Sequence, residues 1–280
     1  MRTLDNFDTN HLLTSLLETG CEDLRPRLEL ISLRFGDVLY EAESKLAHVY
    51  FPITSVVSLL CVMKSGATDE IAFVGNEGIV GVPLFLGATR SPHRAVVRNA
   101  GDAYRLNGQL FLDLFTRSGA MKTLLLRYTQ VMLAQISQTI ACHRHHSVHQ
   151  QFCRWLLSSL DRLPSDELCL TQESIALMLG VRRESITTAV GVLRAAGLIQ
   201  SRRGRISVID RPRLEACACE CYQGMKAELG CLAGTATSTI TAPAFYRQHG
   251  RAAVRYRHVV RGMVNRERVA AAVSAQATCA

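Results

Sequence analysis

Residues 170–199 read LTQESIALMLGVRRESITTAVGVLRAAGLI, and this stretch decides the fold of the C-terminal part of the chain. Thr171 is a suitable N-cap for a first helix, because its hydroxyl can accept a hydrogen bond from a backbone N–H of the first turn. Gly180 tolerates the left-handed conformation that often ends a helix. A second helix is expected from about Arg183 to Gly197. Two short helices joined by a tight turn predict a helix-turn-helix, with an ordinary helical hairpin as the alternative.

The two predicted helices have distinct inward and outward faces. The inward positions are Ile175, Ala176 and Leu179 in the first helix and Ile186, Val190 and Leu193 in the second. The small side chain of Ala176 allows the helices to approach closely. The outward positions near the start of the second helix are Arg182, Arg183, Glu184, Thr187 and Thr188. This end of such a helix reaches base edges in the major groove, where Arg can bind guanine and Glu can accept from cytosine; a solvated surface is the alternative.

The segment that follows the second helix predicts a wing. Two short apolar runs flank a basic turn that contains Gly204, which is typical of a β-hairpin. Arg202, Arg203 and Arg205 of this turn are placed to meet phosphates, which position a protein on DNA without reading its sequence. Asp210 then caps a last helix, with Pro212 near its start.

The N-terminal part of the chain shows a different pattern. Residues 8–25 have helical leucine spacing, whereas residues 28–110 contain short apolar or β-branched runs punctuated by Gly and Pro. The runs cover residues 28–33, 47–51, 56–62, 70–74, 94–98 and 103–106. Many short strands at such spacing predict a sandwich or barrel.

A long helix is predicted over residues 119–146, followed by another over residues 147–163 that Pro164 ends. The long helix is apolar on more than one face and therefore has to be covered on several sides. We expect one face to pack on the β domain and another on a second copy of the chain; a helix buried within one monomer is the alternative. The dimer contacts are assigned to Leu125, Tyr128, Met132 and Ile136.

Composition limits the function classes. The 280 residues carry a formal net charge of +8, and 48% of them are hydrophobic, so the chain can form sizeable cores and suits a polyanionic partner. There is no signal-peptide pattern and no apolar run long enough for a membrane span, so we expect a cytoplasmic protein that does not contact membranes. Glycine-rich phosphate loops, Gly-x-Ser-x-Gly and HExxH are absent, so no enzyme is expected.

Two clusters of possible metal ligands occur near the DNA-binding segment. Cys217, Cys219 and Cys221 alternate, but residues two apart on a helix point in different directions, so only the first and last share a face. His143, His145, His146 and His149 have spacings that can share a metal, yet they also suit a helix C-terminus. We expect free thiols, no metal and no cofactor. Seven arginines in residues 232–280 either add nonspecific DNA affinity or belong to a disordered appendage.

The order of these parts resembles the Crp/Fnr family of bacterial regulators, over about residues 10–222. The motifs that carry the resemblance are NEGIVG at residues 76–81, VRRESI at residues 181–186, and the wing. Arg183, Glu184 and Ser185 match the family's recognition helix, whereas Thr188 stands where some members have Arg. The resemblance implies an α+β fold with a β-roll, similar to a double-stranded β-helix barrel, then a long dimerisation helix and a C-terminal winged helix-turn-helix.

The resemblance also locates a ligand pocket at Gly81, Val82, His93, Arg94 and Ala95. Members that bind cyclic AMP have Gly-Glu where this chain has Gly81-Val82, so a ribose hydroxyl would lose its acceptor, at a cost of roughly 1–3 kcal/mol. Arg94 can reach an anion or be an ordinary surface residue. We therefore expect an unidentified small effector rather than a cyclic nucleotide. Cys21 is the only early cysteine, which argues against an N-terminal iron–sulfur cluster.

Together these observations predict a sensor domain (1–118), a dimerisation helix (119–146), a DNA-binding domain (147–222) and a basic tail (223–280). The sequence leaves open whether the tail is ordered or disordered. The predicted function is a homodimeric transcription regulator that reads a near-palindrome in double-stranded DNA and contacts RNA polymerase. A ligand- or redox-sensing module with weak or vestigial DNA binding is the alternative. The DNA-contacting residues are assigned as Thr171, Gln172, Arg182, Arg183, Glu184, Ser185, Thr187, Thr188, Arg202, Arg203 and Arg205.

Overall fold

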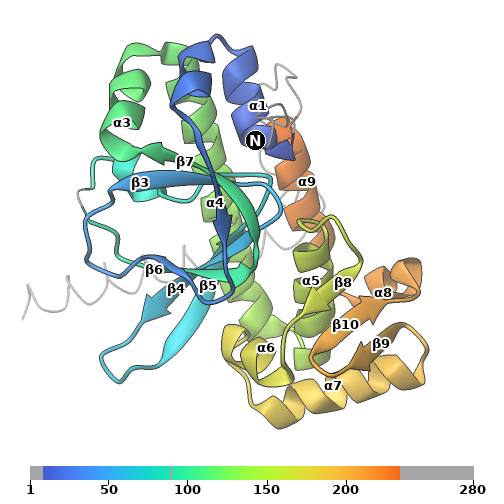
Figure 1. Ribbon diagram of the computed structural model, residues 1–280. Helices are drawn as coiled ribbons and strands as arrows, with labels where there is room; N and C mark the ends of the chain where they lie inside the picture. Colours follow the sequence, from blue (N-terminus) through green and yellow to red (C-terminus); the bar gives the residue numbers. More distant parts are fainter. Residues whose placement is uncertain (1–8, 89, 234–280) are drawn as a thin grey trace, which may run out of the picture. The chain divides into compact units, whose positions relative to one another are not determined.

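A computed structural model describes residues 9–88 and 90–233 (Figure 1). The first part of the chain forms α1 (His11–Glu18), the 3-10 helix η2 (Glu22–Arg27), β1 (Glu29–Leu33), β2 (Val38–Tyr40), β3 (His48–Pro52), β4 (Val56–Val62), β5 (Thr68–Val74), the one-turn helix α2 (Val82–Phe85), β6 (Arg94–Asn99) and β7 (Gly101–Asn107). The second part forms α3 (Gly108–Arg117), α4 (Gly119–His145), α5 (Val148–Leu160), β8 (Glu167–Cys169), α6 (Gln172–Met178), α7 (Arg183–Ala195), β9 (Ile199–Arg202), β10 (Arg205–Val208), α8 (Arg211–Cys217) and α9 (Cys221–Ala233).

The N-terminal part is a β-roll of two antiparallel sheets, with strand orders β1-β7-β3 and β2-β6-β4-β5. The six strands expected from the apolar runs are present, and the three-residue strand β2 is an addition too short to produce a recognisable pattern. The helix expected over residues 8–25 is shorter than predicted. It ends at Glu18 because Gly20 turns the backbone with a φ of +88°, and η2 then leads into the first sheet.

Helix α4 packs along the β-roll, and its N-cap is Ser118, whose side chain accepts a hydrogen bond from the Met121 N–H. Leu125, Tyr128 and Met132 are buried in the core of the β-roll. A Cβ atom at Gly78 would lie 2.1 Å from the Tyr128 hydroxyl, so only glycine fits at this position. We call residues 76–78 (Asn-Glu-Gly) the NEG turn. The sequence assigned Leu125, Tyr128, Met132 and Ile136 to the dimer contact. In the single chain the first three are buried, whereas Ile136 is only partly buried.

A different face of α4 carries uncovered apolar side chains. Leu126, Leu133 and Ile140 are 54%, 55% and 65% exposed, whereas the other large apolar side chains of this helix are buried or half-buried. Successive members of this set are seven residues apart, so they lie in a nearly straight row along the helix. We call this set the α4 stripe.

The C-terminal part is a winged helix with its own core. Ser147 starts α5 with a capping box to Gln150, and Phe152, Trp155 and Leu156 of α5 pack against α6, α7 and the small sheet. That sheet has three strands, in the order β8-β10-β9, rather than the two expected for the hairpin alone. The extra strand β8 pairs with β10 through Leu168 and Ile206.

Two buried carboxylates of the β-roll, Glu70 and Glu77, are bonded to the region of α5. Glu70 of β5 binds Arg98 Nη1 at 3.1 Å and accepts a hydrogen bond from the Trp155 indole Nε1 at 3.1 Å. Arg162, just after α5, donates through Nε to Glu77 at 2.6 Å. Charges removed from water require such partners, so the two contacts hold the parts in a defined arrangement.

The end of the described chain differs from the expected basic tail. Residues 221–233 form α9, which lies beside α4 and α5, so the tail predicted from residue 223 begins as an ordered helix (Figure 1). The arginines expected to act in the tail, Arg247 to Arg268, lie outside the described residues. Among the described helices, none is both long and apolar enough to cross a membrane.

Candidate nucleic-acid interface

The helix-turn-helix has the geometry that the sequence predicts. The Thr171 hydroxyl accepts a hydrogen bond from the Ser174 N–H at 3.1 Å and starts α6. The chain then turns at Gly180, which has a φ of +62°, and the Val181 N–H returns to the Ala176 carbonyl at 3.0 Å. Ala176 is buried between the helices. This turn fixes the start of α7 relative to α6.

The start of α7 presents a polar face to solvent. Arg182, Arg183, Glu184, Thr187 and Thr188 are exposed, Ser185 is half-buried, and the buried stripe of the helix runs along the opposite side. Arg182 occupies the N-cap position and its side chain makes no capping hydrogen bond, so the first turn keeps N–H groups available for an anion.

Helix α6 supports this face. Gln172 Oε1 accepts a hydrogen bond from the Thr187 hydroxyl at 2.8 Å, which ties the first helix to the second next to the recognition residues. Gln172 therefore helps to hold the Thr187 side chain in place. Its own predicted contact with DNA stays a prediction. Thr171 is exposed at the start of α6.

The wing is a tight hairpin between β9 and β10. Its turn contains Arg203, with a φ of +48°, and Gly204, with a φ of +76°. Arg202 and Arg203 are exposed, whereas Arg205 forms an ion pair with Glu167 at 3.2 Å. Two of the three predicted phosphate-binding arginines are therefore exposed to solvent. The positive charge of the third is partly neutralised by the carboxylate of Glu167.

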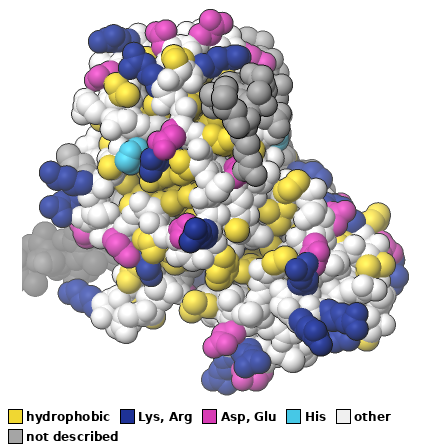
Figure 2. All heavy atoms as spheres, viewed as in Figure 1, with side chains coloured by type: hydrophobic (Ala, Val, Ile, Leu, Met, Phe, Trp, Pro, Cys, Tyr) yellow, Lys and Arg dark blue, Asp and Glu magenta, His cyan; other side chains and the backbone are white. Residues whose placement is uncertain are grey.

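The space-filling view shows how these charges are arranged. In Figure 2, Lys and Arg side chains lie over α7 and the β9–β10 hairpin at the lower edge of the molecule, and others lie at the top and at the left of the same face. Acidic side chains are interspersed among them, as expected for Glu184 in the recognition segment. The recognition helix and the wing therefore carry part of the positive charge seen on this face, and a DNA-binding surface needs such charge.

The positions assigned to the ligand pocket are not arranged to hold a cyclic nucleotide in the family's manner. Val82 is a buried apolar side chain at the start of α2, and Ala95 is buried in the core of the β-roll. Arg94 is engaged by Glu41, with 3.0 Å between Nε and the carboxylate. Burial lowers the pKa of His93 below its usual value, so this ring is neutral near pH 7. The five assigned positions therefore offer no carboxylate for a ribose hydroxyl, and their one arginine, Arg94, is paired with Glu41.

The cysteine and histidine clusters are rearranged by a break in the last helical segment. The expectation of one continuous helix through the cysteines is wrong, because α8 ends at Cys217 and α9 begins at Cys221. Cys219 and Cys221 consequently meet Cys142 and His146 from the end of α4. Sequence reasoning missed this grouping because it treated the cysteines and the histidines as separate clusters.

Comparison with known proteins finds a matching family model for each of the two parts of the chain. A family model of the cyclic nucleotide-binding domain matches residues 30–118, and a model of the Crp-like helix-turn-helix domain matches residues 150–217. No curated protein matches the chain. Solved structures with the same fold include FixK2 from Bradyrhizobium japonicum, which is 16% identical with a TM-score of 0.60 and aligns over 69% of this chain and 98% of its own.

Two further structures show the same architecture. A Crp/Fnr family transcriptional regulator from Thermus thermophilus is 23% identical with a TM-score of 0.52, over 68% of this chain and 98% of its own. The c-di-GMP-responsive global regulator CLP from Xanthomonas campestris is 15% identical with a TM-score of 0.52, over 69% of this chain and 98% of its own. The two family models cover more than half of the sequence, in the order that the fold shows. The chain therefore belongs to the Crp/Fnr family of DNA-binding transcription regulators, with a cyclic nucleotide-binding type of domain before a Crp-like helix-turn-helix.

Proposed function

We propose that this regulator binds a near-palindromic operator as a homodimer and that a signal received by the β-roll controls the binding. The observation that supports the proposal best is the exposed polar face at the start of α7, held by the turn at Gly180 and flanked by the arginines of the wing. A surface with this geometry fits a major groove with the wing beside it.

Within this face, each residue type has a distinct role. Arg183 reads guanine through two hydrogen bonds, and Glu184 accepts from the amino group of cytosine. Ser185, Thr187 and Thr188 contact bases or phosphates nearby. Arg202 and Arg203 of the wing bind phosphates and set the register, as do the free N–H groups at the start of α7.

The α4 stripe is the proposed dimer contact. Two helices pair in a coiled coil through apolar residues at two positions of each seven-residue repeat, and Leu126, Leu133 and Ile140 occupy one of these positions. Ile136, which is only partly buried, lies at the edge of the same contact. Two paired α4 helices place the two recognition helices about 34 Å apart, in successive major grooves.

The signal passes from the β-roll to the DNA-binding part through the buried contacts between them. A small effector that displaces β5 or the NEG turn also moves Glu70 or Glu77, and each of these carboxylates is bonded to the region of α5. A cyclic nucleotide does not suit the pocket, because Val82 is apolar and Arg94 is paired with Glu41. The bound dimer then recruits or blocks RNA polymerase.

The test of direct readout is a selection of binding sites from a random DNA pool, followed by anisotropy titrations of the selected site and of random DNA. Arg183→Ala should weaken binding to the selected site by about 1–3 kcal/mol and relax the preference at one position of each half-site. Arg194→Ala is the matched control, because Arg194 is also exposed on α7 but lies in its last turn.

The control should keep the preference of the wild type, since it loses the same charge without losing a base contact. Equal losses in the two variants, or no enrichment of any sequence by the wild type, would contradict direct readout. The second outcome would favour a sensor module with vestigial DNA binding.

A further inference from the structure

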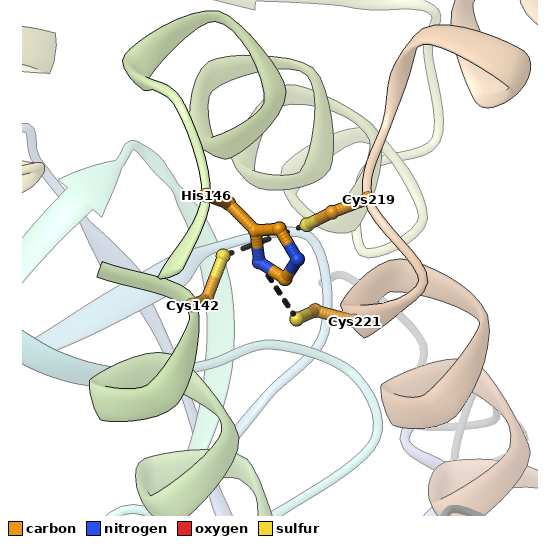
Figure 3. A group of neighbouring side chains, drawn as sticks. All are labelled: Cys142, His146, Cys219 and Cys221. Carbon is orange, nitrogen blue, oxygen red and sulfur yellow. Dashed lines mark hydrogen bonds between the residues drawn. The ribbon is translucent and has the colours of Figure 1, made fainter. Parts of the chain in front are cut away.

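Four potential metal ligands meet where α4 ends beside the α8–α9 connection (Figure 3). Cys142 lies in the last turn of α4 and His146 caps its C-terminus. Cys219 lies between α8 and α9, and Cys221 is the first residue of α9. The three sulfur atoms and a ring nitrogen of His146 all lie within 4.8 Å of one another, although more than 70 residues separate the two pairs in the sequence.

Local backbone structure produces this convergence. Cys142 and His146 are four residues apart, so they project from the same side of the end of α4. The chain is extended at Ala218, with a ψ of 158°, and this break allows Cys219 and Cys221 to face α4 together. In a continuous helix the same two residues would point in different directions.

We propose that Cys142, His146, Cys219 and Cys221 form a mononuclear, tetrahedral zinc site. Three thiolates and one imidazole are a common ligand set of structural zinc sites. Zinc–sulfur bonds of about 2.3 Å place neighbouring tetrahedral ligands about 3.8 Å apart. The separation is 3.5 Å between the Sγ atoms of Cys142 and Cys219, and 3.5 Å between the Sγ of Cys221 and the Nδ1 of His146. An iron–sulfur cluster, with several metal atoms inside its ligands, needs a wider cage.

The groups around these ligands orient them for a metal. His146 Nε2 lies 3.2 Å from the carboxylate of Glu220, so this nitrogen donates its proton and Nδ1 keeps a lone pair that faces Cys221. Histidines that bind metals usually donate their second ring nitrogen in this way. Gln138 Nε2 donates to the Sγ of Cys221 at 2.8 Å, which stabilises a thiolate.

The charge of the surroundings also suits the occupied site. Three thiolates and a neutral imidazole around a dication leave one net negative charge. Arg154 is 2% exposed and, among the described residues, forms no ion pair with a carboxylate. Its guanidinium lies near enough to Cys142 and Cys219 to stabilise negative charge on their sulfur atoms. The buried guanidinium and the anionic site therefore balance one another.

A metal at this position would join the end of α4 to the segment that follows the wing. It would thereby fix the DNA-binding part relative to the helix that carries the proposed dimer contact. Loss or oxidation of the thiolates would release that link, because a protonated or oxidised sulfur no longer binds zinc.

The test uses the full chain, purified with a thiol reductant and without chelators. We expect about one zinc per chain by elemental analysis, and intense visible absorption of tetrahedral cobalt after replacement with Co²⁺. Cys219→Ser should lose both signals. Cys169→Ser, which removes an exposed thiol outside the cluster, should keep both.

A ligand-for-ligand exchange guards against a variant that fails to fold. His146→Cys should still bind one metal, with stronger sulfur-to-cobalt absorption, whereas His146→Ala should bind it far more weakly. The proposal is overturned if wild type and Cys219→Ser contain the same zinc and give the same cobalt spectrum. It is also overturned if Cys142 and Cys219 remain linked by a disulfide in the reduced preparation.

Discussion

At the scale of single residues, Glu70 is held by several buried contacts. Its carboxylate binds Arg98 and Trp155 and also accepts a hydrogen bond from the Ser58 hydroxyl, while the Arg98 guanidinium lies over the rings of Phe73 and Trp155. Arg98 is fully buried, and burial lowers its pKa whereas Glu70 raises it again. The carboxylate is therefore what allows a cation to remain in this position.

Glu70→Ala should consequently be severely destabilising. Removing one partner of a buried ion pair leaves an uncompensated charge, so the free energy of unfolding should fall by about 3–5 kcal/mol. Glu29→Ala is the control, since Glu29 pairs with Arg105 at the surface, and it should cost less than about 1 kcal/mol. Urea denaturation followed by circular dichroism measures both. Similar costs would show that the buried pair contributes no more than the exposed one.

At the scale of elements, α4 serves two surfaces. Its inward face belongs to the core of the β-roll, and the α4 stripe remains uncovered in the single chain. The sequence shows that the helix is apolar on several sides, but it does not show which side the β-roll covers. That depends on long-range packing, such as the close approach of Tyr128 to Gly78.

A charge placed in the α4 stripe should separate the dimer. Leu133→Asp puts a carboxylate at the centre of the proposed contact, where pairing would remove it from water. We expect a monomer at micromolar concentration by light scattering, with the circular dichroism spectrum of the wild type. Phe35→Asp, at an equally exposed apolar residue outside α4, should remain dimeric. A dimeric Leu133→Asp protein would place the contact elsewhere.

At the scale of the whole molecule, local signals predicted the architecture well. The N-cap at Thr171, the turn at Gly180 and the hairpin around Gly204 are encoded by a few neighbouring residues, and each lies where it was expected. The exposure of the assigned recognition residues also follows from helical periodicity. Their contacts with DNA remain a prediction.

Features that depend on partners distant in sequence were not predictable. Glu77 and Arg162 are 85 residues apart, and nothing in their neighbourhoods indicates that they pair. The same is true of Cys142 and Cys219, which come together only because the helix breaks after Cys217. The ion pair of Arg94 with Glu41 likewise depends on how β6 lies beside the loop that follows β2.

Residues 236–280 allow a prediction about the binding of the whole protein to DNA. They carry seven arginines against a single acidic residue, Glu267. Deleting them should weaken binding to random DNA and reduce the slope of log affinity against log salt, because fewer counterions are released. The ratio of operator to random affinity should change little. Anisotropy titrations at several salt concentrations measure both, and an unchanged slope would mean that the tail does not contact DNA.

The position of the single tryptophan gives the molecule an internal optical reporter. Trp155 is the only indole in the chain, it is 2% exposed, and its ring lies between the β-roll and the DNA-binding part with a carboxylate on its N–H and a guanidinium over its face. Any rearrangement of that junction alters the polarity around the indole. The colour and yield of the intrinsic emission therefore register the docking of the two parts directly, without an added dye.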